Sequence, residues 1–354
     1  MAGRPVVMLV DLVADLFVSG VPKRISREAP VLILSYEGER LAPGGGANAV
    51  ANVAALGGRP LLAGVVGDDA YGSGLLAELA ARGIEVGGVV VRPGYRTPTK
   101  VRILGGARHA IKQQIVRYDI EQKLTLTAAE RARLSAHLAA CAPAGARVAI
   151  LSDYGYGTVE PALLPAVRGA LVRTAEDGRG GEESGRGAGS GDGEPAGGGM
   201  VVGDSRYRLD AFRGLDGATP NEEEAEALIG GRLDEVGSLE AGGQTLRARL
   251  GARFLLITRG SRGMSLFRSG EAVHLPVSGT DQVADVTGAG DTVIGTFALA
   301  LAAGADPLEA ALISNYAGGV VVMKMGTATL TPAELARAIR SDPRPLEELR
   351  WARS

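Results

Sequence analysis

Short apolar runs rich in β-branched residues alternate along this chain with segments rich in alanine and leucine. The expected strands and helices follow one another at residues 6–10, 47–56, 61–66, 74–82, 147–152 and 161–173. Such alternation is typical of a parallel sheet with helices on both faces. The strand runs are almost continuously apolar, as expected when helices cover both faces of the sheet. The sequence therefore predicts an α/β fold built on a doubly wound, mostly parallel sheet.

Two stretches, approximately within residues 11–41 and 89–119, depart from this rhythm. Polar and apolar residues alternate there, as in the run Lys100-Val-Arg-Ile-Leu. A period of two is typical of antiparallel strands that expose one face to water. We expect these strands to form a small β-sheet lid over the main domain.

The length of 354 residues suits one large α/β domain, so residues 1–354 are expected to form a single unit. Between residues 174 and 199 the chain consists mainly of glycine, glutamate, serine and arginine. Such a composition cannot bury enough apolar surface to offset its ordering entropy. This stretch is predicted to be a disordered surface insertion.

Charge and cysteine content exclude several classes of function. The formal net charge is only −2 and the arginines are scattered among acidic residues, so we expect no nucleic-acid partner. Cys141 is the single cysteine, which excludes an intramolecular disulfide and favours the reducing cytoplasm. No export signal is recognised at residues 1–10, and no apolar run reaches the roughly 18 to 20 residues that cross a bilayer. A cytoplasmic protein without membrane contact is expected.

The segment from Asp285 to Asp291, Asp-Val-Thr-Gly-Ala-Gly-Asp, precedes an apolar helical run at residues 292–303. Glycines at a helix start leave backbone N–H groups free to bind an anion, and the helix dipole adds positive potential there. A carboxylate at Asp291 would lie beside a bound phosphoryl group and could take a proton from an attacking hydroxyl. An ordinary helix start, with Asp291 only complementing the dipole, is the alternative.

A second glycine-rich segment, Pro43-Gly-Gly-Gly-Ala-Asn48, leads into the helical run at residues 47–56. Adjacent glycines let a ligand approach the backbone closely, and Asn48 offers both a donor and an acceptor to sugar hydroxyls. A helix entered through a glycine turn would explain the same residues. Asp11 and Asp15 follow the first expected strand, four residues apart.

These two segments resemble the C-terminal and N-terminal signatures of the ribokinase-like (phosphofructokinase-B, PfkB) carbohydrate kinases. The resemblance implies ATP-dependent phosphorylation of a sugar hydroxyl, with Asp291 as the base. It also implies an anion hole formed by Gly288, Ala289 and Gly290. The implied sugar-binding residues are Asp15, Gly45, Gly46, Asn48 and Asp291 itself.

Further segments are similar to the nucleotide side of this family. Asn221 and Glu224 match an N-x-x-E pattern associated with hydrated Mg²⁺ and the ATP phosphates, although an acidic helix start would look the same. The other residues expected to contact the nucleotide are Arg206, Thr258, Gly260, Gly263 and Asn315. Asp285 and Thr287 are implied as ligands of a monovalent cation such as potassium.

Within the family, the chain resembles the heptose-7-phosphate 1-kinase branch, the kinase half of ADP-heptose synthesis, over nearly its whole length. Three segments carry the likeness, at residues 99–119, 151–157 and 317–329. The resemblance assigns a phosphorylated sugar to the cations Lys100, Arg102 and Arg117 and a sugar hydroxyl to Asp153. Solvated strand faces or intersubunit ion pairs would also explain the three cations. Tyr156 and Arg206 stand where branch members usually have lysine. Arg206 keeps the positive charge, whereas Tyr156 does not, and this lost cation leaves the acceptor open.

Several other activities are excluded by missing motifs. The sequence contains no Walker loop and no protein-kinase H-R-D or D-F-G motif, and its three histidines are too far apart for the H-x-G-H of a nucleotidyltransferase. The alternatives that remain are a kinase for a hexose, pentose or nucleoside, or an inactive sugar-binding regulatory protein on the same fold. Exposed lid edges favour strand pairing between two copies, so we expect a homodimer through the lid.

Overall fold

The computed structural model describes residues 1–107, 112–172, 198–234, 236–279 and 283–353. Its body is built on one large sheet, with the strand order β14-β13-β12-β11-β10-β9-β8-β1-β4-β5. The bounds of these strands, in chain order, are β1 (Pro5–Val10), β4 (Arg59–Gly67), β5 (Val89–Arg92), β8 (Val148–Asp153), β9 (Met200–Ser205), β10 (Gly217–Ala218), β11 (Phe254–Thr258), β12 (Met264–Arg268), β13 (Glu271–Leu275) and β14 (Arg350–Arg353). The strands from β5 to β11 pair in parallel, and only β12 to β14 run antiparallel. The predicted α/β class is confirmed.

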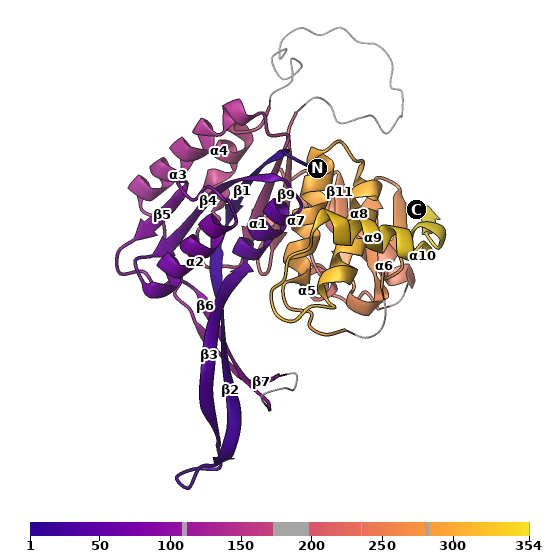
Figure 1. Ribbon diagram of the computed structural model, residues 1–354. Coiled ribbons are helices and arrows are strands. Elements are labelled where there is room, and N and C mark those ends of the chain that lie inside the picture. Colours follow the sequence, from indigo (N-terminus) through magenta and orange to yellow (C-terminus); the bar gives the residue numbers. More distant parts are fainter. Residues whose placement is uncertain (108–111, 173–197, 235, 280–282, 354) are drawn as a thin grey trace, which may run out of the picture.

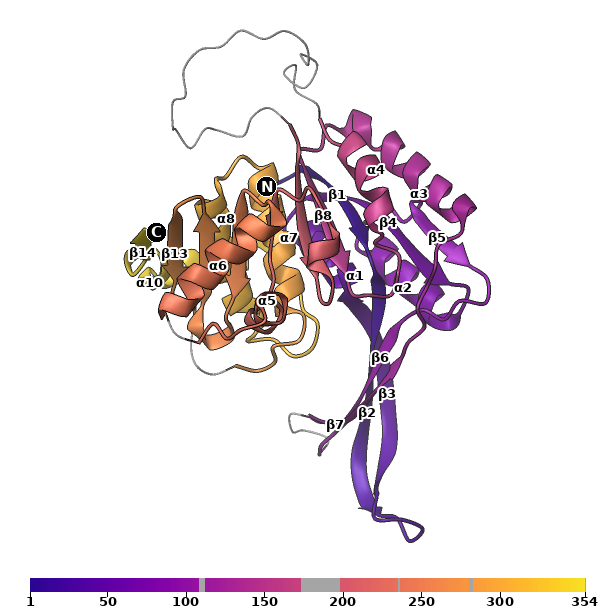
Figure 2. The same cartoon turned by 180° about the vertical axis from the view of Figure 1, so that it is seen from behind.

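Helices cover both faces of this sheet (Figures 1 and 2). One face carries α1 (Gly46–Ala55), α2 (Ala70–Ala81), α7 (Ala289–Ala302), α8 (Pro307–Val321) and α9 (Pro332–Ser341), and the other carries α3 (Ala128–Ala140), α4 (Leu164–Gly169), α5 (Glu222–Ile229) and α6 (Val236–Leu250). A short α10 (Arg344–Glu347) precedes β14. Among the described helices, none is both long and apolar enough to cross a membrane.

Alternate residues of β1 enter two separate apolar cores. Val6, Met8 and Val10 pack with α1, α7 and α8, whereas Val7 and Leu9 pack with α3, α4 and α6. All five side chains are fully buried. A strand between two helix layers has no wet face, which explains why these strands lack the alternation of polar and apolar residues.

A separate four-stranded sheet projects from the body (Figure 1). Its order is β3-β2-β6-β7, with bounds β2 (Leu12–Ile25), β3 (Leu32–Gly45), β6 (Thr99–Gly105) and β7 (Gln113–Ile120). We call it the lid sheet. It differs from the sequence-based expectation in two respects. Residues 89–92 form β5 of the main sheet, because their apolar run pairs with β4, and β2 pairs with β6 in parallel rather than antiparallel.

The insertion predicted at residues 174–199 lies almost entirely outside the described residues, which resume at residue 198. The helices expected from the sequence at residues 47–56 and 74–82 correspond to α1 and α2. The third, expected at 161–173, is a 3-10 turn followed by the short α4. Pro165 lies in the first turn of α4, where proline favours a helix start, and the C-cap of α4 is Ala170.

Candidate active site

The candidate site lies where the carboxyl ends of the parallel strands meet the start of α7 and the base of the lid sheet. Asp11 directly follows β1, and Asp153 is the last residue of β8. Open parallel sheets bind ligands at this edge because the connecting loops leave a crevice there. Asp291, Asn48 and Asp15 are brought to the same place from three distant parts of the chain.

Asp291 lies in the first turn of α7 and is only 3% exposed. Its two carboxylate oxygens accept hydrogen bonds from different partners. The Tyr154 hydroxyl donates to Oδ1 at 2.6 Å, and the Asn48 side-chain amide donates to Oδ2 at 3.3 Å. Each oxygen keeps one lone pair for a further donor, so the carboxylate is oriented but still able to accept a proton.

Burial raises the pKa of the Asp291 carboxyl to about 7. The hydrogen bonds from Tyr154 and Asn48 oppose this rise, as does the positive charge of Lys100, whereas the carboxylate of Asp15 adds to it. A general base works best when its pKa lies near the working pH, because it is then ionised often enough and still binds a proton well. The environment of Asp291 meets this requirement.

The start of α7 has the open space that the predicted anion hole requires. Gly288 is the N-cap, with a left-handed φ of 75°. A Cβ on Gly288 would lie 2.4 Å from Asn48 Nδ2, so glycine is required both by the backbone and by the close amide. A Cβ on Gly290 would meet no described atom within 4 Å. The first-turn N–H groups of a helix have no intrahelical acceptor and therefore favour an anion in this open space.

Asn48 is fixed by hydrogen bonds to its neighbours. Its Nδ2 donates to the Gly288 carbonyl at 3.2 Å as well as to Asp291, and its Oδ1 accepts from Asn52 Nδ2 at 3.2 Å. These partners determine which way round the amide lies. Gly45 and Gly46 precede it at the end of β3 and start of α1, and both are buried. The sugar-binding role predicted for Asn48, Gly45 and Gly46 stays a prediction.

The lid sheet presents two rows of side chains toward one face. Strand register places Arg40, Phe17, Arg102 and Arg117 side by side across β3, β2, β6 and β7. Two residues further along the strands, the same pairing joins Ala42, Asp15, Lys100 and Asp119. Residues directly opposite each other in a sheet point to the same face, so the cations predicted from the sequence share one surface. We call this surface the cationic lid face.

Charges on the cationic lid face are partly compensated. Arg102 forms a buried ion pair with Asp15, and Arg117 pairs with Asp119 at 2.9 Å. Burial raises the pKa of Asp15, but Arg102, Lys100 and Arg117 oppose that rise. Burial lowers the pKa of Lys100, whose ammonium lies 5.3 Å from the centroid of the Tyr154 ring. The face therefore carries more positive than negative groups.

Arg40 is a cation of this face that the sequence did not single out. Its guanidinium lies 4.8 Å from the centroid of the Phe17 ring, and that of Arg102 lies 5.4 Å from the same ring. Phe17 also contacts the position of Gly326, where a Cβ would lie 2.8 Å from its ring. The lid therefore touches the loop that follows α8 through an aromatic ring held between two arginines.

Asp11 and Asp153 both accept hydrogen bonds from other groups of this chain. Asp11 is fully buried and accepts from the backbone N–H groups of Tyr154, Tyr156 and Thr158 at 2.9 to 3.0 Å. Burial raises its pKa to about 6. Asp153 receives two hydrogen bonds from Arg208, at 2.9 and 3.0 Å, and others from neighbouring groups. These bonds engage both carboxylate oxygens of Asp153, and the contact predicted between Asp153 and a substrate hydroxyl stays a prediction.

Tyr156, which stands where the resembled branch usually has lysine, points its side chain toward the lid sheet rather than toward the start of α7. Its hydroxyl donates to Glu121 at 2.7 Å, and its carbonyl accepts from the Leu124 N–H at 2.7 Å. Glu121 immediately follows β7, so this contact ties the 154–158 loop to the end of the lid sheet. Tyr156 therefore contributes a neutral hydroxyl, not a cation, to the contact between this loop and the lid sheet.

The residues predicted for the nucleotide lie together at the ends of β9 to β11. Asn221 and Glu224 form a capping box at the start of α5, with hydrogen bonds of 2.8 and 2.9 Å. Asn221 is paired in parallel with Thr258, the last residue of β11. Gly260 and Gly263 have left-handed φ values of 55° and 80°, and a Cβ on Gly263 would lie 2.0 Å from the Leu275 carbonyl. The capping box explains the N-x-x-E pattern locally without excluding a phosphate role.

Three further residues lie among those predicted for the nucleotide or next to them. Burial and the charge of Glu224 raise the pKa of Asp204 well above its usual range. Arg206 is exposed and its guanidinium lies 5.7 Å from the Tyr207 ring centroid. Asn315, in α8, donates to the Pro276 carbonyl at 2.7 Å. Asp204 was missed by the sequence analysis, although the Asp-x-Arg spacing with Arg206 was a usable signal.

Asp285 and Thr287 lie in the turn before the anion hole. Asp285 accepts from the N–H groups of Thr287 and Gly326, both at 2.9 Å. Burial raises the pKa of this carboxyl, but these hydrogen bonds outweigh it and the net pKa is lowered. Thr327 Oγ1 is buried and finds no hydrogen-bond partner among the described residues. An ionised carboxylate beside an unpartnered hydroxyl oxygen fits a small cation in chemistry.

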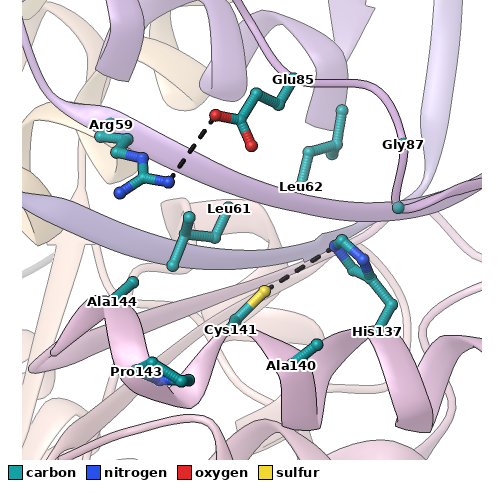
Figure 3. A pocket seen from close by; sticks show the side chains of 11 residues that line it. Arg59, Leu61, Leu62, Glu85, Gly87, His137, Ala140, Cys141, Pro143 and Ala144 are labelled. Atoms are coloured by element: carbon teal, nitrogen blue, oxygen red, sulfur yellow. Dashed lines mark hydrogen bonds and ion pairs between the residues drawn. The ribbon is translucent and has the colours of Figure 1, made fainter.

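A cavity of about 400 Å³ lies elsewhere, at the amino end of β4 and the carboxyl end of α3 (Figure 3). Arg59 and Glu85 pair at its rim, and Cys141 Sγ lies 3.8 Å from His137 Nε2. Burial raises the pKa of the Cys141 thiol, which makes it a poor nucleophile. The cavity is on the edge of the sheet opposite Asp291 and takes no part in the candidate site.

Comparison with known proteins gives matches over most of the chain. The model of the pfkB family carbohydrate kinases matches residues 7–144 and 206–334. Bifunctional protein HldE of Mesorhizobium japonicum is 39% identical over 337 residues, which are 95% of this chain and 62% of that protein. The HldE proteins of Azotobacter vinelandii and Caulobacter vibrioides are each 38% identical, over 96% of this chain and 64% of their own length. The chain thus spans less than two thirds of these relatives.

Solved structures show the same fold at low sequence identity. Phosphofructokinase-2 from Escherichia coli in complex with substrates and products superposes with a TM-score of 0.70 and 17% identity, over 96% of this chain and 99% of that one. Ribokinase from Arabidopsis thaliana, complexed with ribose and ATP, gives 0.67 and 20% over the same shares. A further structure of the Escherichia coli protein is a complex with potassium, at a TM-score of 0.70 and 18% identity.

Proposed function

Because this chain belongs to the pfkB family of carbohydrate kinases, we propose that it transfers the γ-phosphoryl group of MgATP to a hydroxyl of a phosphorylated sugar. The observation that carries the proposal is the position of Asp291. Its buried carboxylate, with a pKa of about 7, lies in the first turn of α7 next to the open space at Gly290, and it interacts with Asp15 and Lys100 of the lid sheet.

Each part of the site has a role in this reaction. Asp291 takes the proton of the attacking hydroxyl, and the first-turn N–H groups at Gly288, Ala289 and Gly290 stabilise the charge that develops on the transferred group. Asp15 and Asn48 hold the sugar. Closure of the lid sheet excludes water, which would otherwise compete with the sugar for the phosphoryl group.

We propose the 1-hydroxyl of a heptose 7-phosphate as the acceptor. The resemblance of residues 99–119, 151–157 and 317–329 to that branch supports it, and so does the identity of up to 39% to the HldE proteins. The cationic lid face gives a physical reason for a phosphorylated acceptor. Lys100, Arg102, Arg117 and Arg40 would bind the sugar phosphate, while the reacting hydroxyl would lie at Asp291.

The residues of the nucleotide side fit ATP with Mg²⁺. Bound Mg²⁺ neutralises charge on the ATP phosphates and so assists their transfer. Oxygen ligands are what Mg²⁺ prefers, and it usually keeps several waters. Among the described residues no three Asp, Glu, His or Cys side chains are placed to hold a metal together. We propose, as the family resemblance implies, that Asn221 and Glu224 act on Mg²⁺ through water, with Asp204 beside them, and that Asp285, Thr287 and Thr327 hold a potassium-type ion.

The test is an ADP-release assay with MgATP and a panel of sugars and sugar phosphates, including heptose 7-phosphates and sedoheptulose 7-phosphate, run beside Asp291→Asn. Turnover on a heptose phosphate that the variant loses is the expected result. Turnover confined to other sugars would support the proposed kinase activity but contradict the proposed acceptor. No turnover on any of them, with thermal stabilisation by a sugar, would indicate a sugar-binding protein instead.

A further inference from the structure

Tyr154 is held in place from four sides. Its backbone N–H donates to Asp11 at 2.9 Å, and its hydroxyl donates to Asp291 Oδ1 at 2.6 Å. Lys100 lies over its ring, 5.3 Å from the centroid. A Cβ on Gly45 would lie 3.2 Å from the edge of the same ring, so the absence of a side chain there leaves room for it. This degree of fixation is what a precisely oriented donor requires.

The tyrosine hydroxyl remains a donor at every working pH. Burial, the charge of Asp291 and that of Asp204 raise the pKa of Tyr154 well above its usual value. A protonated phenol has one O–H, and that O–H is directed at Asp291. Hydrogen bonds to a charged acceptor are stronger than bonds between neutral groups, so this contact favours the ionised carboxylate.

We propose that Tyr154 is a positioning residue of the phosphoryl transfer, which orients the Asp291 carboxylate and stabilises its ionised form through the hydroxyl bond to Oδ1. The proposal rests on the proposed function, in which Asp291 is the base. In that step the acceptor O–H breaks and its proton passes to Asp291. The acceptor oxygen bonds to the γ-phosphorus while the bond from that phosphorus to the β-γ bridging oxygen breaks, which releases ADP. The Tyr154 proton stays on the phenol throughout.

Several charged groups also face Asp291 and set the background for this contact. Asp15 of β2 raises its pKa and Lys100 of β6 lowers it. Asp204 at the end of β9 interacts with it as a like charge, and Arg206 lies near Asp204 and Tyr154. Tyr154 and Asn48 are the two direct hydrogen-bond donors to the carboxylate among the described residues. Removal of the Tyr154 hydroxyl leaves the charges unchanged and takes away one of these two donors.

The experiment compares the pH dependence of kcat in the wild type, Tyr154→Phe and Tyr156→Phe. MgATP and a sugar phosphate that the wild type phosphorylates are both present at saturating concentration. Tyr156 is the matched control, because it lies in the same loop and its hydroxyl donates to Glu121 instead. We expect the acidic limb of Tyr154→Phe to move up by about one pH unit, with about tenfold lower kcat below pH 6 and nearly full activity above pH 9. Tyr156→Phe should keep the wild-type limb.

A second variant keeps the proposal testable if Tyr154→Phe does not fold. Replacement of Tyr154 by 3-fluorotyrosine keeps the shape and makes the phenol a stronger donor, so the acidic limb should move down. An unmoved limb in both Tyr154 variants, or an equal shift in Tyr156→Phe, would overturn the proposal. The carboxyl carbon-13 titration of Asp291, assigned by its loss in Asp291→Asn, gives an independent readout. It reports the effect of Tyr154→Phe even if no sugar is phosphorylated, which separates this proposal from the proposed function.

Discussion

Asn48 and Asp291 are 243 residues apart in the chain, yet the Asn48 amide nitrogen lies 3.3 Å from the Asp291 carboxylate. The same nitrogen donates to the carbonyl of Gly288, the N-cap of the helix that carries Asp291. The start of α1 is thereby joined to the start of α7. This connection brings the two glycine-rich segments of the sequence together at one carboxylate.

Replacement of Asp291 by asparagine should nearly abolish turnover. Loss of a general base costs about 10² to 10⁴ in rate, and the isosteric amide keeps the shape of the site. MgATP binding, measured by calorimetry, should stay within about threefold of wild type, because the first-turn N–H groups are retained. Turnover within tenfold of wild type would rule out Asp291 as the base.

The same variant should be more stable than the wild type at high pH. The pKa of Asp291 is about 7 in the folded protein and 3.8 when unperturbed, so the folded state binds the proton more tightly. Above pH 7 the carboxyl is ionised in the folded protein, and its burial lowers the free energy of unfolding by the full amount. This penalty becomes smaller as the pH falls from 7 toward 4. Urea unfolding should give Asp291→Asn a gain on the order of 1–3 kcal/mol at pH 8 and a smaller gain at pH 5. A loss of stability at pH 8 would contradict the assigned burial penalty.

The cationic lid face should select phosphorylated acceptors. Arg117→Gln and Lys100→Met each remove one cation while leaving the Arg102–Asp15 pair intact. We expect KM for the sugar phosphate to rise about 10- to 100-fold, since a charge-assisted hydrogen bond contributes about 1.5–3 kcal/mol. KM for the unphosphorylated sugar should change little. Lys23→Gln, at the exposed far end of β2, is the control and should leave both values unchanged. Equal effects on the two sugars would argue against a phosphate site.

The lid sheet should mediate a homodimer. Its outer strands expose large apolar side chains, among them Tyr36 at 65% and Tyr118 at 51%. Charges placed there would have to be buried by a partner, so Tyr36→Glu and Tyr118→Glu should shift the mass measured by light scattering toward the monomer. Trp351→Glu, 52% exposed on β14, is the matched control and should keep the wild-type mass. A monomeric wild type at micromolar concentration would contradict the prediction.

Two glycines of the anion hole should respond differently to alanine. Gly290 lies within the first turn of α7 with open space before it, so Gly290→Ala should keep the wild-type melting temperature but lower turnover at least tenfold, because its methyl group enters the anion hole. Gly288→Ala combines a left-handed φ of 75° with a contact to Asn48, and should lose about 1–3 kcal/mol of stability. Wild-type turnover in Gly290→Ala would place the phosphoryl group elsewhere.

Much of the fold followed from local pattern. The continuous apolar runs of β1, β4 and β8 predicted a covered parallel sheet, because a strand between two helix layers must be apolar on both faces. Alternating polar and apolar residues around Lys100 and Arg117 predicted strands of the lid sheet, because a strand with one face in water is apolar only on the other face. Residues 89–92 lie at the edge of the stretch expected to hold lid strands but join the main sheet, since a four-residue apolar strand carries no signal of which sheet it joins.

The candidate site was predictable where backbone chemistry dictates the residue type. Glycine at 288 and 290 and a carboxylate in the first helical turn are needed for an anion hole with a base, so the sequence alone pointed to Asp291. The roles proposed for Tyr154 and Arg40 were not predictable in this way. Tyrosine and arginine occur in many settings, and only the neighbours of these two residues suggest a role for them.

By itself the sequence determined the fold class, the glycine turns and the identity of the buried carboxylate, because period, φ preference and helix-terminus chemistry act over a few residues. The tertiary structure alone decided that Asp11 holds the 154–158 loop, that Tyr156 pairs with Glu121, and that Tyr154 reaches Asp291. Those contacts join residues 35 to 145 positions apart. They form only when separate strands and helices pack together, and packing depends on the shapes of all the side chains at once.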